Sequence, residues 1–502
     1  MRMDKHDSAA PLTQVPPQLE SLTVESLQEL FYGCSDVKIK EFTMGDAATP
    51  QRVVLIYCEG LSDVMHINKD IFPRLNHLFH QHSIQNASDL DQNRPLPMYP
   101  LNDDLDANEI VDRVFSGNLL LFFEQLSCLY WAESSDPPKR NPEETSTDTS
   151  IRGPRDGFTE ELIVNVALVR KRLKTPQLHY EQFILGTQYH TVAGLLYVEN
   201  QMSQDLLSSI RHKLASIKIE GIVSMTQLEE LLTNKRFQLL PIFEYTGRPD
   251  FVVNALLHGK FVILLNGSPT AIIAPVDFTF LLNTPEDAEN PFLFVAFTRL
   301  LRIIGVVLAL FLPGFWVSLI TFHQDQLPYT LIATLVMSRQ GVPLPASLEA
   351  FLMLFLFELF REAGLRLPSA VGQTISVVGG LIVGEAAISA GLTAPGILVI
   401  IAISVMSTFT LVNQNLVSAV VLLRIVTMLI CSFLGLFGFM MCIMGVLVYF
   451  TNVRSFGVYY FTPISPFIRS DIYKTIFRIP WRSNYEKPDS LNPTFAKEGK
   501  KK

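Results

Sequence analysis

The chain has 502 residues, enough for two or three structural units, and 48% of them are hydrophobic. Its formal net charge of −8 gives no electrostatic support for a nucleic-acid-binding function. The sequence contains no GxxxxGK[ST], GxSxG or HExxH motif, so we predict that the protein is not an enzyme and holds no cofactor or metal ion.

The N-terminal 290 residues are predicted to form a soluble domain. Residues 1–29 contain no positively charged segment that leads into an apolar run, so we predict no signal peptide. Residues 1–35 are predicted to form a disordered tail. Strand-like and helix-like patterns then alternate between residues 36 and 280, which favours an α/β or α+β fold. We expect this domain to stay on the cytoplasmic side of a membrane.

Two stretches of the soluble domain resemble each other in the same order. The segment Glu41-Phe-Thr-Met-Gly45 is similar to Gln182-Phe-Ile-Leu-Gly186, and a helical stretch that ends at Gly117 is similar to one that ends at Gly259. The offsets of these and a third match lie between 140 and 142 residues. We therefore predict two similar subdomains, each with a strand, helices and a closing hairpin.

Composition sets the predicted domain boundaries. Residues 134–150 are rich in Pro, Ser, Thr, Asp and Glu, which is typical of a flexible linker. The predicted organisation is a tail at 1–35, a first subdomain at 36–133, the linker at 134–150, a second subdomain at 151–290, a transmembrane domain at 291–455 and a basic, cytoplasmic tail at 456–502.

Beyond position 300 the sequence predicts an all-α transmembrane bundle. Residues 303–322 and 425–450 carry no charge and are long enough to cross a bilayer. Residues 371–391 and 396–412 are weaker candidate spans. The apolar stretch 348–360 is too short for an ordinary span, so we predict a re-entrant or interfacial segment there. Basic residues near the spans suit either four or five crossings, and the number stays open.

The candidate span at 371–391 has two different faces when drawn as a helix. One face carries small residues at the spacing that lets membrane helices approach closely, and we predict that it packs against protein. These residues are Ser376, Gly380, Gly384, Ala387 and Gly391. The opposite face carries an ionisable residue, and we propose that it lines a pore, although a buried, paired carboxyl is the alternative. Its residues are Thr374, Val378, Leu381, Glu385 and Ser389.

A charge cluster follows the short apolar stretch. Arg361 and Glu362 lie three and four positions after Glu358, and Arg366 lies four after Glu362, so on one helix Arg361 can relieve the repulsion between the two carboxylates. A structural role is one interpretation. An ion pathway or a coupling to a gate is the other.

Several motifs together resemble the GerA family of spore germination proteins. The most specific runs from Arg152 through Gly153, Pro154, Arg155, Gly157 and Phe158 to Glu161. The helical half contributes Leu312-Pro-Gly-Phe315, Gly341-Val-Pro-Leu-Pro345, Gly384-Glu-Ala-Ala387 and Ser455-Phe-Gly-Val458 in the family's order. The chain departs from the family pattern at Glu385, where Gln is expected.

The resemblance implies the A subunit of a nutrient germinant receptor in the inner membrane of a bacterial endospore, with its N-terminal domain on the spore-core side. The implied partners are a transporter-like B subunit, a lipoprotein C subunit, membrane lipid and further copies of the chain, which form an ion-conducting ring. Two alternatives are a non-conducting scaffold subunit and the relative encoded with the dipicolinate channel genes. The nutrient, the ion and the ring size do not follow from the sequence.

Overall fold

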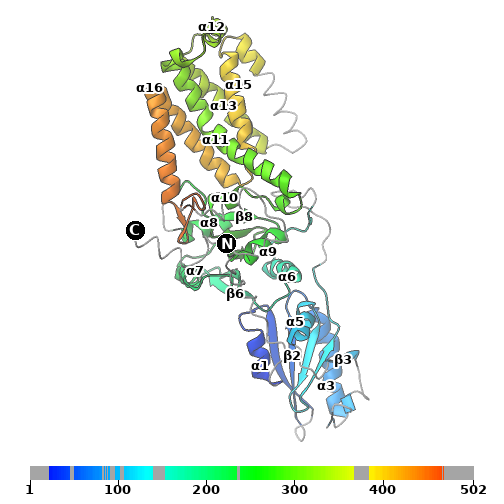
Figure 1. Ribbon diagram of the computed structural model, residues 1–502. Coiled ribbons are helices and arrows are strands. Elements are labelled where there is room, and N and C mark those ends of the chain that lie inside the picture. Colours follow the sequence, from blue (N-terminus) through cyan, green and yellow to red (C-terminus); the bar gives the residue numbers. More distant parts are fainter. Residues whose placement is uncertain are drawn as a thin grey trace, which may run out of the picture. The chain divides into compact units, whose positions relative to one another are not determined.

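The computed structural model divides the chain into two compact units, a sheet unit and a helical unit (Figure 1). The sheet unit contains the described residues up to 233 together with Phe243–Pro275, and the helical unit contains residues 238–242 and those from Val276 onward. The structure describes residues 22–45, 50–81, 84, 86, 89–90, 96–101, 107–138, 153–233, 238–366, 384–465 and 467. The helical unit thus includes residues 276–290, which the sequence analysis assigned to the second subdomain.

The sheet unit contains two five-stranded antiparallel sheets with the same strand order. The first has the order β1 (Val37–Met44), β2 (Gln51–Cys58), β4 (Leu119–Phe123), β5 (Cys128–Ala132), β3 (Met98–Pro100). The second has the order β6 (Leu178–Leu185), β7 (Thr191–Val198), β9 (Phe261–Leu265), β10 (Ala271–Ala274), β8 (Glu244–Thr246). This is the correspondence that the internal repeat predicts.

Matching glycines also end matching elements. Gly45 and Gly186 follow β1 and β6 with φ of 91° and 94°, and Gly117 and Gly259 follow the helices before β4 and β9 with φ of 91° and 79°. A residue with a Cβ is strained in this left-handed region, so glycine can end both the strands and the helices without strain.

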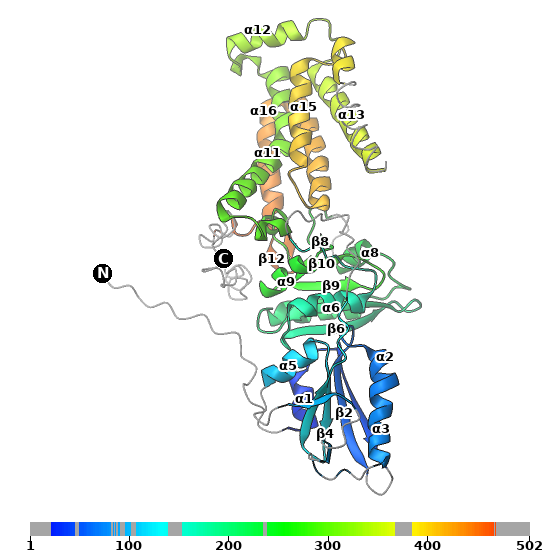
Figure 2. The same ribbon diagram turned by 90° about the vertical axis from the view of Figure 1, so that its right-hand side faces the viewer.

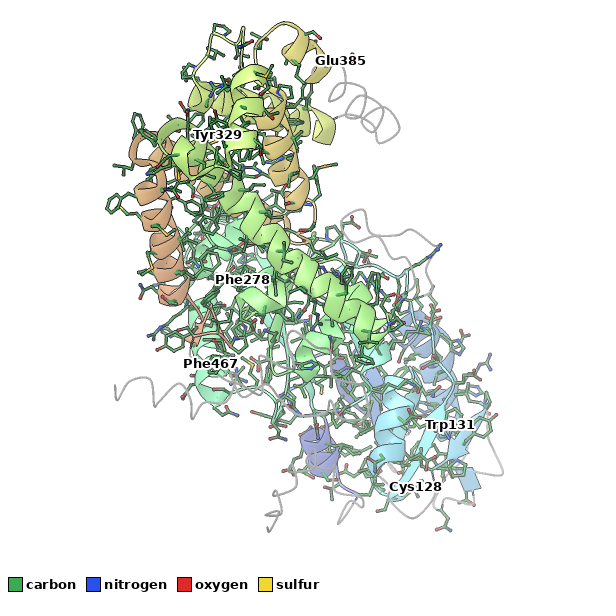
Figure 3. All side chains as sticks on the ribbon, turned by 45° about the horizontal axis from the view of Figure 1, so that its top comes forward. Cys128, Trp131, Phe278, Tyr329, Glu385 and Phe467 are labelled. Carbon is green, nitrogen blue, oxygen red and sulfur yellow. The ribbon has the colours of Figure 1, made fainter. Side chains whose placement is uncertain are left out.

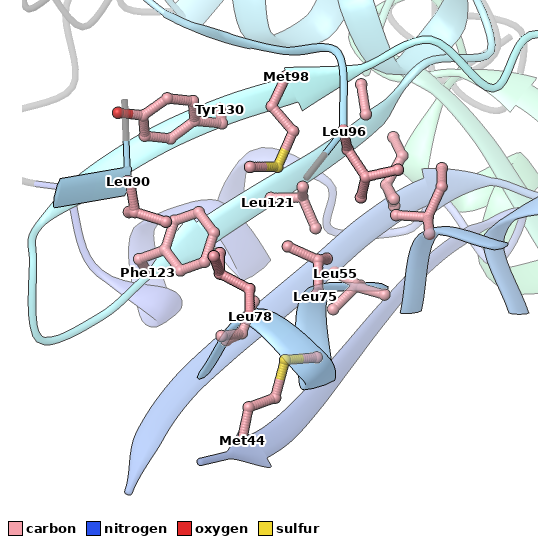
Figure 4. Close-up of a cluster of buried hydrophobic side chains, with 14 of the residues drawn as sticks. Met44, Leu55, Leu75, Leu78, Leu90, Leu96, Met98, Leu121, Phe123 and Tyr130 are labelled. Carbon is pink, nitrogen blue, oxygen red and sulfur yellow. The ribbon is translucent and has the colours of Figure 1, made fainter. Parts of the chain in front are cut away.

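Helices cover the sheets and bury their apolar residues. The helices of this unit are α1 (Val24–Leu30), α2 (Val64–His66), the π-helix η1 (Ile67–Ile71), α3 (Phe72–Gln81), α5 (Ala107–Phe115), α6 (Leu162–Arg172), α7 (Gln204–Ser216), α8 (Met225–Leu232) and α9 (Pro249–Leu257). Figure 4 shows one core, in which Leu75 and Leu78 of α3 pack with Leu55, Leu121 and Phe123 of the first sheet. The other face of that sheet packs with α1 and α5.

The predicted disordered tail is wrong for residues 22–35. Thr23 and Ser26 form a capping box that starts α1, and Leu27 and Phe31 are buried in the core of the first sheet. Burial of these side chains stabilises a helix that is too short to form alone. In the internal repeat α1 occupies the position of α6.

The helical unit begins with α10 (Phe278–Leu281) and the 3-10 helix η2 (Pro285–Ala288) (Figure 2). Its remaining elements are α11 (Phe292–Phe322), the 3-10 helix η3 (Gln324–Gln326), α12 (Tyr329–Ser338), α13 (Ala346–Arg366), α15 (Pro395–Thr408), α16 (Gln414–Asn452), β11 (Arg454–Ser455) and β12 (Val458–Tyr459). Residues 384–389 are also helical. Two helices, α11 and α16, are long and apolar enough to cross a membrane, each with a mean hydropathy of 2.5.

The predicted short apolar segment at 348–360 is part of a longer helix. The 21-residue α13 continues through Glu358, Arg361 and Glu362. The apolar stretch ends where these charged residues begin, so hydropathy alone underestimated the length of the helix. In the structure Glu358 and Arg361 form an ion pair within the helical unit. The candidate span at 371–391 lies mostly outside the described residues.

The predicted span at 425–450 is not one straight helix. Gly435, with φ 58° and ψ −142°, breaks α16 into arms of 21 and 17 residues, 414–434 and 436–452. In a continuous helix Thr427 and Phe439 would lie about 18 Å apart, but both lie beside the same part of α11: a Cβ at Gly314 would lie 3.0 Å from the Thr427 side chain, and Phe439 contacts Phe315 with ring centroids 5.2 Å apart. The arms therefore fold back on each other. Hydropathy missed the break because it registers side-chain polarity and not backbone conformation.

The contacts of α16 show which helix ends lie together. A Cβ at Gly435 would lie 3.1 Å from the Cβ of Phe322, at the C-terminal end of α11. At the other end, Phe450 contacts Phe278, which precedes α11, with ring centroids 5.4 Å apart. The chain thus enters α11 and leaves α16 at the same end of the bundle, which we name the proximal end; the end at Phe322 and Gly435 is the distal end.

Candidate functional site in the helical unit

A buried charge network joins four helices of the helical unit. Arg424 of α16 is fully buried, and its Nη2 donates a hydrogen bond to Glu358 of α13. Its Nη1 donates to the hydroxyl of Ser404 in α15 at 3.3 Å, and that hydroxyl donates to the Ala309 carbonyl of α11 at 2.9 Å. Arg361 binds the other oxygen of Glu358 at 2.8 Å. One carboxylate therefore holds two guanidinium groups, and α11, α13, α15 and α16 all contribute.

The network lies about halfway along the bundle. Its residues from α11, α13, α15 and α16 lie 9 to 15 residues from the distal ends of their helices, which corresponds to about 14 to 22 Å. The Nε of Arg424 is buried without a hydrogen-bond partner among the described residues. A buried polar group without a hydrogen-bond partner lowers the stability of the fold, and apolar residues in its place would avoid this cost. The network is therefore a candidate for a functional role.

Of the predicted charge cluster, the structure brings only Glu358 and Arg361 into this network. Glu362 is exposed, and the side chain of Arg366 lies outside the described residues. The sequence analysis missed Arg424 and Ser404 as network members. An isolated arginine between two apolar stretches is the signal that could have indicated Arg424.

A second buried carboxylate lies at the distal end of the bundle. Glu349 of α13 is fully buried; its Oε1 accepts a hydrogen bond from Arg339 at 2.8 Å, and its Oε2 accepts one from the Ala394 N–H at 2.9 Å. Ala394 is the residue before the first turn of α15. Glu349 thus connects the α12–α13 turn to the start of α15.

The short helix at 384–389 presents two different faces. Gly384 and Ala387 are buried, and Ala387 belongs to the apolar core formed with α13 and α15. Glu385 and Ser389 are exposed on the surface of the chain. Figure 3 labels Glu385 beside the grey trace. Gly391 has φ 67° and lies against the Gly341 carbonyl. The other predicted members of the two faces, Thr374, Ser376, Val378, Gly380 and Leu381, lie outside the described residues.

Glu385 lies near the distal end of the bundle. A Cβ at its neighbour Gly384 would lie 3.4 Å from the side chain of Leu398, which is four residues past Ala394 in α15. Glu385 is thus about one helical turn from the distal end, whereas the Glu358 network lies near the middle.

Charged groups also fix the proximal start of α11. Arg302 binds both oxygens of Asp287 at 2.9 and 3.0 Å and donates to the Leu282 carbonyl, and Arg299 binds Asp287 at 3.3 Å. Burial alone would raise the pKa of Asp287, but the hydrogen bonds and charge of Arg302 outweigh burial and lower it below its ordinary value. The carboxylate is therefore ionised at neutral pH.

The predicted family motif packs against the second sheet. The Phe158 side chain is buried and its N–H donates to the Gly247 carbonyl at 2.8 Å. Gly157 is buried, Gly153 and Pro154 are half-buried, Arg155 is exposed, and Arg152 lies outside the described residues. Asn165 is fully buried and binds the Thr159 backbone on both sides, at 2.7 and 2.6 Å. This arrangement gives the motif a structural role in the sheet unit.

A buried ion pair joins the two sheets of the sheet unit, and the sequence analysis did not detect it. Arg170 of α6 binds both oxygens of Asp36, each at 2.8 Å, and its Nη1 donates to the Thr175 and Leu178 carbonyls. Burial alone would lower the pKa of Arg170, but the Asp36 charge raises it above its ordinary value. The two groups are 134 residues apart in sequence, so no local pattern could have paired them.

Comparisons with known proteins identify a family of similar sequences. A sequence model of the family described as Bacillus/Clostridium GerA spore germination protein matches residues 25–490. Spore germination protein XA of Bacillus anthracis is 45% identical over 93% of this chain and 95% of its own length. Spore germination protein KA of Bacillus subtilis is 30% identical over 95% of this chain and 87% of its own length.

One solved structure also matches part of the chain. It is the N-terminal domain of the A subunit of the Bacillus megaterium spore germinant receptor GerK3, with a TM-score of 0.37 and 22% identity. The match covers 51% of this chain and 96% of that one.

Proposed function

The chain belongs to the Bacillus/Clostridium GerA family of spore germination proteins, and on that premise we propose that it is the membrane subunit of a germinant receptor and forms an oligomeric, nutrient-gated ion channel. Its partners in this proposal are a transporter-like B subunit, a lipoprotein C subunit and further copies of the chain. The sheet unit lies on the core side of the inner spore membrane.

The arrangement of helix ends supports an even number of membrane crossings. Phe278 before α11 contacts Phe450 at the end of α16, so the chain enters and leaves the bundle at the proximal end. Five crossings would put these two points on opposite sides of the membrane. An even number keeps the segment after α16 on the core side, together with Arg299 and Arg302, as the positive-inside rule expects.

The exposed carboxylate of Glu385 carries the proposal of a pore. An ionisable side chain within a bilayer does not face lipid, because the desolvation cost is high; it faces protein or water. Gly384 and Ala387 already pack against the chain's own core, which leaves Glu385 and Ser389 directed away from it. Several copies that place this surface around one axis would enclose a water-filled path with a ring of carboxylates, which favours cations.

The Glu358 network supports the same proposal from inside the bundle. A distance of about 14 to 22 Å from the distal end is near the midplane of a bilayer whose apolar core is about 30 Å thick. Two guanidinium groups on one carboxylate hold four helices in one register at that depth. A change in this register would move the segment that carries Glu385.

We predict that Glu385→Gln leaves assembly intact and reduces cation selectivity, because it removes the charge and keeps nearly the same shape. Conduction itself persists, because Gln is the residue that the family pattern has at this position. The measurement is the reversal potential of the reconstituted receptor under a potassium gradient, with subunit abundance checked by immunoblot.

The matched control is Asp325→Asn. Asp325 is exposed in η3, at the distal end of α11, so this change removes one negative charge from the same end of the bundle but from a different element than the helix that carries Glu385. We expect it to leave the reversal potential unchanged. Equal reversal potentials for wild type and Glu385→Gln, at equal abundance, would exclude Glu385 from the pore.

A further inference from the structure

The segment after α16 begins with a tight hairpin, and Ser455 of this hairpin is fully buried. β11 and β12 pair Arg454 with Tyr459 and Ser455 with Val458. The two turn residues, Phe456 and Gly457, both have positive φ, 47° and 90°, as a two-residue type I′ hairpin requires. Phenylalanine is rare in this conformation, so the surroundings of the hairpin must hold it there.

Ser455 bridges two chain segments that are far apart in sequence. Its hydroxyl donates a hydrogen bond to the Ile242 carbonyl at 2.8 Å and accepts one from the Val276 N–H at 3.1 Å. Both segments belong to the helical unit. Only Phe243 separates residues 238–242 from β8, and Val276 follows β10 after a single proline. These are the two points at which the chain passes between the helical unit and the second sheet.

Further contacts fasten the same two segments to the end of α16. The Leu239 N–H donates to the Tyr449 hydroxyl at 3.1 Å, and the Phe278 N–H donates to the Tyr460 carbonyl at 2.7 Å. The ring of Phe278, labelled in Figure 3, contacts Phe450, Tyr460 and Phe461. Tyr460 is fully buried. Both chain connections therefore end on the 436–452 arm of α16.

We propose that Ser455 is a positioning residue that couples the sheet unit to the membrane helices: a displacement of β8 or β10 is transmitted through Ile242 and Val276 to the end of α16. The inference rests on the proposed germinant-receptor function. It adds the route by which the sheet unit acts on the membrane helices. The 436–452 arm, which precedes Ser455, contacts α11 through Phe439, whose ring meets Phe311 edge to face and lies tilted against Phe315.

The test compares Ser455→Ala, Ser455→Thr and the control Ser432→Ala in the full-length chain. Ser455→Ala removes the bridge, and Ser455→Thr keeps the hydroxyl. Among the residues that the structure describes, the Ser432 hydroxyl donates its hydrogen bond to the Met428 carbonyl of its own helix alone, so its loss leaves the two connections intact. The first readout is hydrogen exchange of the purified chain in detergent. For Ser455→Ala we expect about tenfold faster amide hydrogen exchange in peptides that contain Val276. For Ser455→Thr and Ser432→Ala we expect the wild-type exchange rate in these peptides.

The second readout is germination of spores in response to a defined mixture of amino acids and sugars. We expect Ser455→Ala to raise the concentration for half-maximal germination about tenfold at normal receptor abundance, and Ser455→Thr to restore the wild-type value. If the Ser455→Ala chain is absent from the membrane, the test uses Gly457→Ala instead. This change strains the turn but keeps the Ser455 hydroxyl.

The outcomes separate this inference from the proposed channel. An unchanged nutrient response with faster exchange would overturn the coupling, and so would unchanged exchange at Val276. Failure of the wild-type receptor to conduct ions would contradict the channel, but it would leave the exchange and germination comparison fully interpretable.

Discussion

Glu358→Gln should destabilise the helical unit by about 3 to 5 kcal/mol and reduce the amount of the chain in the membrane, because it leaves the buried Arg424 guanidinium without a counter-charge. Arg361 adds a second positive charge at the same place. The double variant Glu358→Gln/Arg424→Gln removes both partners of the buried pair and should recover most of the loss. The measurement is denaturant unfolding of the purified chain in detergent, together with membrane abundance.

Glu362→Gln provides the control on the same helix. Glu362 is exposed and four residues from Glu358, so its neutralisation should cost less than about 1 kcal/mol. A double variant that is abundant but germinates poorly would show that the network also acts in gating. If Glu358→Gln were as stable and as abundant as wild type, the network would not hold the helices together.

Arg170→Met should lower the stability of the sheet unit by about 3 to 5 kcal/mol, because it leaves the Asp36 carboxylate buried and unpaired. It also removes the hydrogen bonds to the Thr175 and Leu178 carbonyls and the stacking of the guanidinium 4.3 Å from the Phe115 ring centre. The measurement is thermal unfolding of the full chain in detergent, followed by far-ultraviolet circular dichroism.

The neighbouring residue supplies the control for this prediction. Lys171 is exposed, so Lys171→Met removes a positive charge of the same helix without uncovering a buried partner. We expect a change within about 0.5 kcal/mol. Equal unfolding curves for Arg170→Met and Lys171→Met would contradict the assignment of Arg170 as the link between the two sheets.

The similarity of the two sheets could be predicted because duplication repeats local signals. Gly117 and Gly259 end equivalent helices, and the apolar runs after them form the central strands β4 and β9. Helix α1 was missed because the matches between the copies begin at Glu41 and Gln182, after α1 and α6. Its burial depends on a sheet whose strands follow it in the sequence.

The helical unit was harder to predict from the sequence. Apolar stretches indicated α11 and α16, but the reversal at Gly435 depends on one backbone conformation that many glycines never adopt. The pairs that build the candidate site are distant in sequence: Glu358 and Arg424 are 66 residues apart. Ionisable residues within apolar stretches indicated candidate site residues such as Glu385. Which of the other ionisable residues pair with each other could be identified only from the fold.

The most direct test of the proposed channel is nutrient-triggered ion flux in liposomes that contain the purified receptor with its three kinds of subunit. The account predicts that a defined mixture of amino acids and sugars starts a cation flux, that receptor lacking this chain conducts nothing, and that Glu385→Gln shifts the reversal potential toward lower cation selectivity. Flux that persists at full amplitude without this chain would contradict the account, because another subunit would then form the pore.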